Sequence, residues 1–152
     1  MVTETKKVRI FDSQQNKIVY VDRVTKTNEE WKKLLTPEQY AITTKKGTEQ
    51  PFTCAFAEVK EPGIFQCIRC GTDLFRSSTK FESGTGWPSF YEPVSELNVK
   101  SIDDFSLGMR RTEVLCARCD SHLGHVFNDG PPPTGLRYCM NGYALKFIPE
   151  RR

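Results

Sequence analysis

Two Cys-x-x-Cys pairs constrain this chain of 152 residues more than any other feature. Cys67 and Cys70 form the first pair, and Cys116 and Cys119 form the second. Each pair can present two sulfur atoms from one tight turn, and two such turns complete the tetrahedron that zinc prefers. Four thiolates close the coordination sphere, so we expect one structural Zn2+ ion that stabilises the fold and leaves no position for water or substrate.

Other uses of these cysteines fit the spacing less well. A single Cys-x-x-Cys can be a thioredoxin-like redox pair, but here two pairs occur without a surrounding βαβ pattern. Buried free thiols are a further alternative. Four thiolates can also accept iron, so the sequence leaves the identity of the metal open.

The composition is that of one soluble domain, which we expect to be a monomer. Hydrophobic residues make up 38% of the chain and charged residues 27%, with a mean hydropathy of -0.51. These values fit neither a membrane protein nor a disordered one. The formal net charge is +3, and the cationic residues are spread along the chain. We therefore expect no nucleic-acid partner.

The expected location is the cytoplasm. The chain has no apolar stretch of about 18 residues that could span a membrane, and its start lacks the apolar run of a secretory signal. Six cysteines in a secreted chain would suggest three disulfides, whereas in a reducing compartment they indicate metal ligands and redox chemistry. The spacing of the two pairs favours the second interpretation.

The predicted fold class is α+β and mainly antiparallel β. Residues 1–26 are predicted to form an N-terminal β-hairpin extension, because two segments rich in β-branched and aromatic residues flank the polar turn SQQN. Capping-box patterns at Thr27 and Thr36 predict two short helices at the start of a domain that spans residues 27–150. From Pro51 onward, glycine and proline separate short apolar runs, which favours a loop-rich antiparallel sheet body.

Cys54 and Cys139 belong to neither pair, which makes them the candidates for chemistry. A lone cysteine is most often a small buried hydrophobe. For Cys139 that alternative is weakened by Arg137, which can lie on the same face of a strand and favour the thiolate, the reactive form. Asn141 lies at the same phase on the other side of the cysteine.

The chain has two histidines, His122 and His125, and both lie in one short segment that we expect to be a loop. Each could be an ordinary hydrogen-bonded residue or a metal ligand. Because the four paired cysteines already satisfy a zinc ion, the histidines are available for proton transfer near neutral pH.

A third cluster is the segment SGTGWPSF around Trp87. Glycines beside a tryptophan in a loop can form a shallow apolar wall that is open to a ligand. The alternative is that Trp87 packs in the core, and composition does not decide between the two.

Together these clusters resemble the B-type methionine sulfoxide reductases, a family of protein-repair enzymes that act under oxidative stress and reduce the R epimer of methionine sulfoxide. The similarity runs from about Trp31 to Phe147, and the order and combination of its motifs are highly specific. The matching strings are TEQPF, the two Cys-x-x-Cys pairs, SGTGWPSF, RRTEV, DSHLGHVFNDGP and GLRYCMN. Only the N-terminal hairpin lies outside the similarity.

The resemblance implies a fold of two small antiparallel sheets, with the zinc site at one end, and an oxidoreductase activity. Cys139 would be the catalytic cysteine, whose thiolate attacks the sulfoxide sulfur and becomes a sulfenic acid. His122 and His125 match active-site histidines that could deliver a proton or hold a water molecule. The other implied site residues are Asp129, Arg137 and Asn141 around the same pocket, and Trp87, which packs on the methyl group of the substrate.

Two departures from the family pattern matter. Thr85 stands where many members carry a resolving cysteine, so Cys54 is the candidate that would attack the sulfenic acid. A single-cysteine mechanism, in which an external thiol attacks directly, is the alternative. Gly142 and Tyr143 stand where the family more often has a serine and a small residue, which can alter the pocket wall.

Two functions from different classes therefore fit the sequence. As an enzyme, the chain would reduce methionine-R-sulfoxide in oxidised proteins or peptides, with electrons from thiols or a thioredoxin-like reductant. As a non-catalytic, zinc-ribbon-like binding module, it would use the four paired cysteines and no reactive one. Cys139, together with its arginine and histidine neighbours, favours the enzyme, because a binding module has no need of a thiolate beside a cation and proton donors.

Overall fold

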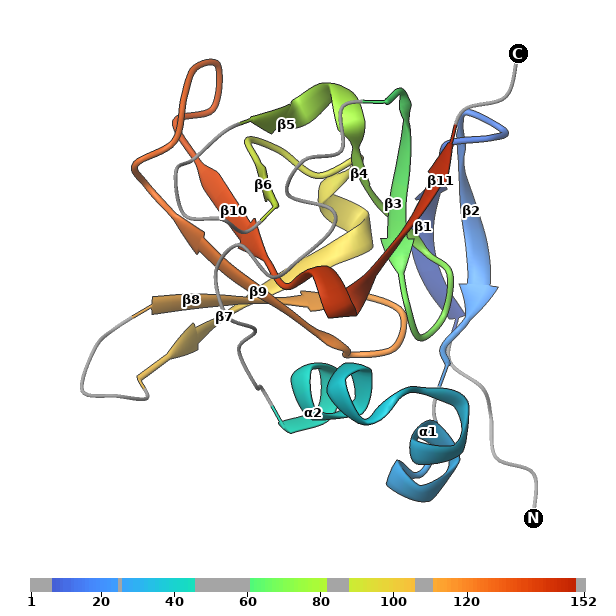
Figure 1. Cartoon of the computed structure of the whole chain (residues 1–152). Coiled ribbons are helices and arrows are strands. Elements are labelled where there is room, and N and C mark those ends of the chain that lie inside the picture. The colour runs from blue at the N-terminus through green and yellow to red at the C-terminus, as the bar shows by residue number, and fades with distance from the viewer. Residues whose placement is uncertain (1–6, 25, 46–60, 82–87, 106–110, 150–152) are drawn as a thin grey trace.

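The structure, a computed structural model, describes residues 7–24, 26–45, 61–81, 88–105 and 111–149 of the chain. Its first elements are the hairpin strands β1 (Lys7–Asp12) and β2 (Lys17–Asp22) and the helices α1 (Asn28–Leu34) and α2 (Pro37–Lys45). Two antiparallel sheets form the body that follows (Figure 1). The expected α+β, mainly antiparallel architecture is therefore confirmed.

The larger sheet has six strands in the order β5-β6-β10-β9-β8-β7. These strands are β5 (Lys80–Phe81), β6 (Ser89–Phe90), β7 (Val99–Asp104), β8 (Arg111–Cys116), β9 (His122–Phe127) and β10 (Arg137–Met140). The smaller sheet has the order β11-β3-β4 and contains β3 (Gly63–Cys67), β4 (Asp73–Arg76) and β11 (Leu145–Pro149). All of these strand pairs are antiparallel, so one face of a sheet can be buried while the other carries polar residues.

A cluster of aromatic rings joins the two sheets. Phe65 on β3 and Phe75 on β4 both contact the ring of Phe90 on β6, with ring centroids 5.1 and 4.5 Å apart. All three side chains are fully buried. Aromatic pairs at such distances add stability beyond the burial of their area, so the shared core fixes the smaller sheet against the larger one.

Both helices begin as the sequence predicts. The Thr27 hydroxyl accepts a hydrogen bond from the Glu30 amide (3.2 Å), and the Glu30 carboxylate accepts one from the Thr27 amide (3.0 Å). Thr36 and Gln39 form the same reciprocal pair before α2. Among the described residues, neither helix has the length and apolar character that crossing a membrane requires.

Within the predicted extension, β1 and β2 pair as a hairpin, which forms a separate two-stranded sheet attached to the body. Asn98 accepts a hydrogen bond from the Phe11 amide (2.8 Å) and donates one to the Phe11 carbonyl (3.0 Å). At the hairpin turn, the carboxylate of Asp73 accepts hydrogen bonds from the hydroxyl and the amide of Ser13 (2.6 and 3.0 Å). The hairpin is therefore anchored to the body through two buried polar side chains.

Candidate active site and metal centre

The four paired cysteines converge as the sequence predicts. Their sulfur atoms all lie within 4.8 Å of one another, and the Cys67–Cys119 and Cys70–Cys116 sulfur pairs are each 3.6 Å apart. Three of the four side chains are buried. Four mutually adjacent sulfur ligands are the donor set of a closed tetrahedral metal site, so these residues can hold a metal ion.

Two turns with the same hydrogen-bond pattern build this cluster. The amide of Gly71 donates to the carbonyl of Cys67, and the amide of Asp120 donates to the carbonyl of Cys116, each at 2.9 Å. Gly71 and Asp120 both have positive φ, 77° and 63°. Glycine adopts this conformation without strain, and aspartate tolerates it better than most residues. Each pair is therefore followed by the left-handed residue that its turn requires.

The electrostatics of the cluster favour a bound cation. Burial raises the pKa of the Cys67 thiol well above its usual value, whereas hydrogen bonds from the neighbouring cysteines lower the pKa of Cys70. Four thiolates in contact would repel one another in the absence of a positive charge. A bound metal ion would supply that positive charge.

Side chains from the N-terminal elements pack on both turns. The guanidinium of Arg69, inside the first turn, lies 4.5 Å from the ring centroid of Trp31 on α1. In the second turn, the Arg118 carbonyl accepts a hydrogen bond from the amide of Val24 (3.1 Å). Its guanidinium donates to the Asp22 carbonyl (2.9 Å). The hairpin and the first helix thus pack against the four-cysteine cluster from outside.

Cys139 lies elsewhere, in the middle of the larger sheet. It is on β10, directly opposite His125 of β9 and Ser89 of β6. Its exposed fraction is 7%, and it forms no disulfide with any described cysteine. Side chains of directly opposed residues lie on the same face, with Cβ atoms about 4.5 to 5.5 Å apart. Cys139 and His125 are therefore neighbours on one face of the sheet.

The same face carries further polar side chains on β8 and β10. The row through Cys139 continues from His125 to Glu113 on β8. Two residues further along their strands, Arg111 and Arg137 lie on this face as well. The opposite face carries Val114, Tyr138 and Met140, which belong to the buried core. We call the first of these faces, defined by Glu113, His125, Arg137 and Cys139, the polar face.

A bulge in β9 brings the second histidine onto the polar face. His122 and His125 are three residues apart, so in a regular strand they would point to opposite faces. The pairing shifts between Val114 and Leu115, which face Gly124 and His122, so that Leu123 is an extra residue. Bulges of this kind re-aim side chains beside active sites. The segment expected to be a loop is thus a bulged strand, and the bulge unites the two histidines, whose ring centroids are 5.6 Å apart.

Asn141 secures that bulge. Its backbone amide and its side-chain amide both donate to the carbonyl of Leu123, at 2.8 and 3.2 Å. Close contact between the strands also requires Gly124, because a Cβ atom there would lie 2.1 Å from the Cys139 carbonyl oxygen. Asn141 and Gly124 therefore keep β9 and β10 at the separation and register that the polar face needs.

Each histidine is held by a carboxylate that the sequence analysis did not single out. Nδ1 of His122 lies 2.7 Å from a carboxylate oxygen of Glu113, and Nε2 of His125 lies 2.8 Å from a carboxylate oxygen of Asp104. Glu113 belongs to the RTEV string. Its alternation with Arg111 along the strand is the sequence pattern that could have indicated that both lie on one face. Asp104 lies on β7 and reaches His125 from two strands away, so its role was not visible in the sequence.

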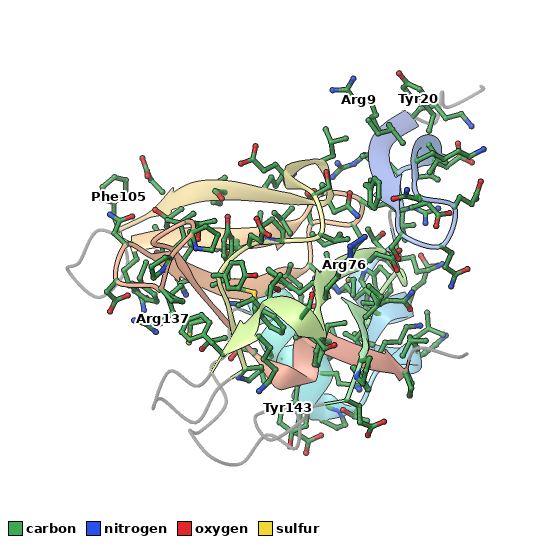
Figure 2. The ribbon with its side chains drawn as sticks, turned by 90° about the horizontal axis from the view of Figure 1, so that it is seen from above. Arg9, Tyr20, Arg76, Phe105, Arg137 and Tyr143 are labelled. Carbon is green, nitrogen blue, oxygen red and sulfur yellow. The ribbon has the colours of Figure 1, made fainter. Side chains whose placement is uncertain are left out.

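Arg137 forms an ion pair with Asp129. Its guanidinium donates to both carboxylate oxygens of Asp129, at 2.9 and 3.3 Å, and lies 4.4 Å from the ring centroid of Phe127. The ion pair holds the pKa of Asp129 below its usual value. Arg137 lies at the end of the molecule that also carries Phe105, opposite the hairpin with Tyr20 (Figure 2). The two predicted polar residues therefore meet each other at one end of the polar face.

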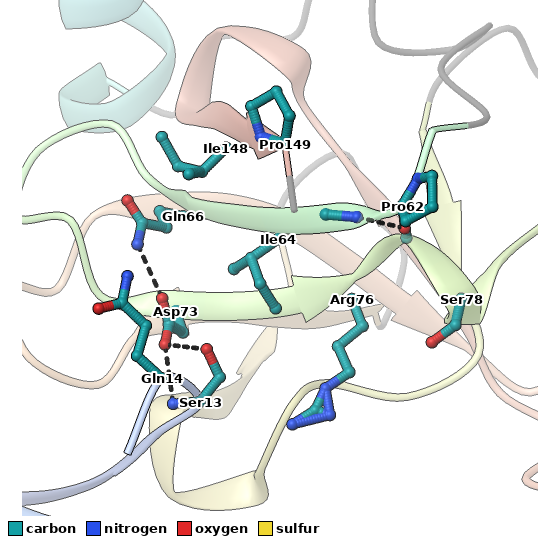
Figure 3. A pocket seen from close by; sticks show the side chains of 12 residues that line it. Ser13, Gln14, Pro62, Ile64, Gln66, Asp73, Arg76, Ser78, Ile148 and Pro149 are labelled. Atoms are coloured by element: carbon teal, nitrogen blue, oxygen red, sulfur yellow. Dashed lines mark hydrogen bonds between the residues drawn. The ribbon is translucent and has the colours of Figure 1, made fainter. Parts of the chain in front are cut away.

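Cys54 and Trp87 lie outside the described residues. A cavity of about 930 Å3 is lined by the hairpin turn and the smaller sheet, with Asp73 and Arg76 in its wall (Figure 3). None of the predicted site residues that the structure describes line this cavity. The polar face, and not this cavity, therefore carries the candidate chemistry.

The family model described as SelR domain matches residues 35–149. The chain is 57% identical over 130 residues to "Peptide methionine sulfoxide reductase MsrB" of Pseudomonas syringae pv. syringae (strain B728a), which covers 86% of this chain and 99% of the relative. It is 58% identical over 127 residues to the protein of the same name from Leptospira interrogans serogroup Icterohaemorrhagiae serovar Lai (strain 56601), over 84% and 97% of the two chains.

Among solved structures, the crystal structure of the Mis18 "Yippee-like" domain is similar with a TM-score of 0.48 and 20% identity, over 60% of this chain and 100% of that chain. The two reductases, in contrast, align along nearly their full lengths. The two alignments cover 86% and 84% of this chain. The match to the family model begins at residue 35, after the hairpin.

Proposed function

This chain belongs to the SelR domain family, and from that membership we propose that it is a peptide methionine sulfoxide reductase acting on the R epimer of peptide-bound methionine sulfoxide. The observation that carries the proposal is the position of Cys139, directly opposite His125 on the polar face of the larger sheet. Relatives that are 57% and 58% identical over 99% and 97% of their own lengths bear the name of this activity.

The proposed reaction begins with the thiolate of Cys139. Its sulfur donates an electron pair to the sulfoxide sulfur while the sulfoxide oxygen, protonated by a histidine of the polar face, is transferred to the cysteine. Methionine leaves as the thioether, and Cys139 becomes a sulfenic acid. Sulfur of the substrate is reduced by two electrons and sulfur of Cys139 is oxidised by two.

A second thiol must then return Cys139 to its reduced form. We propose Cys54 as the resolving residue, which would attack the sulfenic acid, release water and form a disulfide for a thioredoxin-like reductant. The support for Cys54 is chemical, since it is the one cysteine in the sequence besides Cys139 that lies outside the two pairs. Mass spectrometry after one turnover without reductant tests this step, and absence of a Cys54–Cys139 disulfide would leave direct attack by an external thiol.

Zinc is the metal that we propose for the four-cysteine cluster. The donor set of four sulfurs fits Zn2+ and closes its coordination sphere. When bound, the ion would supply folding free energy and neutralise the thiolates, and it would take no part in the reaction. Cys67, Cys70, Cys116 and Cys119 are the residues that would hold it.

We further propose that residues 27–150 carry the activity and that residues 1–26 form an extension to it. The proposed substrates are oxidised proteins or peptides, and the proposed setting is the cytoplasm, where a reducing poise keeps unpaired thiols available. We expect the enzyme to act as a monomer, since the polar face with Cys139 and both histidines is built by one chain.

A thiol-driven assay on the separate R and S epimers of a blocked methionine sulfoxide tests the proposal. We expect turnover of the R epimer only, and no turnover by the Cys139→Ser protein. Turnover by that variant would exclude Cys139 as the nucleophile. Failure of the folded, metal-loaded protein to reduce either epimer would favour the zinc-ribbon-like binding module instead.

A further inference from the structure

The cavity beside the hairpin turn has the smaller sheet as its floor (Figure 3). Ile64 on β3 is directly opposed to Ile148 on β11 and to Arg76 on β4. Directly opposed residues share one face of a sheet, and all three line the cavity. Its volume of about 930 Å3 lies in the range of small-molecule sites, which combine apolar surface with a few polar groups. The floor therefore places two isoleucines beside one cation.

The hairpin turn forms a second wall of the cavity. Ser13 and Gln14 line it from the turn between β1 and β2. Ser13 is fixed there by its two hydrogen bonds to the carboxylate of Asp73 (2.6 and 3.0 Å). The family model matches residues 35–149 and so does not include this turn. The N-terminal extension therefore adds a wall that the matched domain does not supply.

The two charged residues among the described lining residues, Asp73 and Arg76, have different partners. One carboxylate oxygen of Asp73 accepts a hydrogen bond from the side-chain amide of Gln66 (2.8 Å), and the other accepts from Ser13. Both oxygens are thus bonded within the protein. The guanidinium of Arg76 contacts an aromatic ring, and no carboxylate of the described residues forms an ion pair with it. The cavity wall therefore carries a positive charge without a counter-ion in the described part of the chain.

The hairpin also holds this cation in place. The Arg76 guanidinium lies 5.9 Å from the ring centroid of Phe11 on β1, a cation–π contact. A guanidinium has five N–H donors, and a contact with a ring face leaves them for an oxygen acceptor. The neighbouring hydroxyl of Ser77 accepts a hydrogen bond from the amide of Gly63 (2.9 Å) and keeps its own O–H as a donor. Two adjacent lining residues can therefore donate to an oxyanion.

We propose that this cavity binds a ligand with one carboxylate and a short apolar body. The carboxylate pairs with Arg76, whose planar fork matches its two oxygens, and the apolar body lies on Ile64 and Ile148. One cation balances one negative charge, and the carboxylate of Asp73 in the same wall disfavours a dianion such as phosphate. The same chemistry occurs at the C-terminus of a peptide and in a free aliphatic acid. The proposal goes beyond the reductase activity and does not depend on it.

NMR titration of the full chain tests the ligand class. The probes are N-acetyl-leucyl-leucine, the same dipeptide with a C-terminal amide, hexanoate and inorganic phosphate. We expect dissociation constants of about 1 mM or tighter for the carboxylate probes and at least about tenfold weaker binding of the amide and of phosphate. Tighter binding of the dipeptide than of hexanoate would assign the site to chain ends, and the reverse order would assign it to small acids.

The amide resonances locate the bound probe. We expect shifts at Ser13, Gly63 and Ser77, and none at His125 or Cys139, which lie on the polar face. Three results would each overturn the proposal. They are no binding of either carboxylate probe up to about 10 mM, equal affinity for the dipeptide and its amide, and shifts confined to other parts of the molecule.

Variants of Arg76 test the role of the charge. We expect Arg76→Gln to weaken binding of the carboxylate probes by about tenfold or more and to leave binding of the amide probe unchanged. Arg76→Lys, which keeps the charge without the planar fork, should have intermediate affinity. Arg9→Gln is the matched control, since Arg9 is an exposed arginine of the same hairpin, and it should bind as the intact protein does. Wild-type affinity of Arg76→Gln would overturn the carboxylate site.

Ile148→Ser keeps the proposal testable if the Arg76 variants do not fold. The Ile148 side chain is 40% exposed, so its loss should leave the fold intact while weakening both carboxylate probes by about threefold or more. Ile102→Ser, at a position 43% exposed on β7, is the matched control and should bind normally. Unchanged affinity of Ile148→Ser would remove the apolar floor from the site. Because these measurements need no turnover, their outcome is independent of whether the protein reduces methionine sulfoxide.

Discussion

Cysteine sulfur has different surroundings in the four-cysteine cluster and at Cys139. Both are built from buried sulfur: Cys67 and Cys116 are fully buried, and Cys139 is 7% exposed. In the cluster, the four sulfurs all lie within 4.8 Å of one another. At Cys139, the opposed residue is a histidine held by a carboxylate. The comparison teaches that the neighbours of a cysteine, and not its burial, decide between metal binding and redox chemistry.

The largest expected effect comes from removing the reactive sulfur. We predict that Cys139→Ser lowers the rate of sulfoxide reduction by at least about a thousandfold, since an alcohol cannot replace a thiolate nucleophile. Bound metal and melting temperature should stay at their wild-type values, because no cluster residue changes. Metal analysis and calorimetry on the same preparation check this, and loss of metal in this variant would contradict the separation of the two sites.

Removing one sulfur of the cluster should lower metal content and stability and spare the chemistry at Cys139. We predict that Cys116→Ser loses the metal and about 3 kcal/mol or more of stability, or roughly 10 °C in Tm. Whatever protein stays folded should keep measurable activity per folded molecule. Full metal content with an unchanged Tm would show that the cluster is not a structural metal site.

A substitution at Gly124 tests whether β9 must lie as close to β10, the strand of Cys139, as it does in the structure. We predict that Gly124→Ala costs about 1 to 3 kcal/mol, because the new Cβ would lie 2.1 Å from the Cys139 carbonyl oxygen, which is backbone and cannot rotate away. Activity should fall along with stability, whereas metal content should not. Ser101→Ala, an exposed position on β7, is the control, and denaturant unfolding is the measurement.

A substitution at Asn98 tests whether attachment of the hairpin contributes to the free energy of unfolding of the body. Its side chain makes three hydrogen bonds, two to Phe11 and one to the carbonyl of Asp73 (2.6 Å). We predict that Asn98→Ala lowers the free energy of unfolding by about 1 to 3 kcal/mol with kcat unchanged, because the anchor lies on the side of the hairpin and not of Cys139. A stability equal to wild type would mean that the hairpin contributes nothing to the body.

The smallest effect concerns the ion pair of Asp129 and Arg137. Arg137 lowers the pKa of Asp129 in the folded protein, so the pair stabilises the fold at neutral pH and this contribution is lost as the pH falls through the lowered pKa. We predict that Asp129→Asn is slightly less stable than wild type at pH 7 and that the difference vanishes in strong acid. Thermal melts over this pH range check the sign. A difference that persists at the acid end would point to another cause.

The metal centre could be predicted from sequence because it is built locally. Each half is a short turn whose spacing, with the left-handed residue that follows it, is written in consecutive positions such as Cys67–Gly71. The capping boxes at Thr27 and Thr36 and the polar turn of the hairpin are local in the same sense. Such features need no knowledge of what packs against them.

The polar face could be predicted only in part, because it depends on register. The resemblance indicated Cys139, His122 and His125 individually, but the extra residue at Leu123 that unites the histidines is a property of the pairing with β8. Asp104 on β7 reaches His125 on β9 across the intervening strand β8, a contact that sequence distance does not suggest. Both features depend on nonlocal strand pairing, which the motifs do not specify.

The central claim is that redox chemistry belongs to Cys139 and that the four-cysteine cluster stays inert. One turnover of a methionine-R-sulfoxide peptide without reductant, in the Cys54→Ser protein with a sulfenic acid trap, tests it most directly. We predict one methionine per protein, the trapped adduct on Cys139 alone, and full metal content afterwards. An adduct or a disulfide within the cluster, with metal released, would contradict the claim.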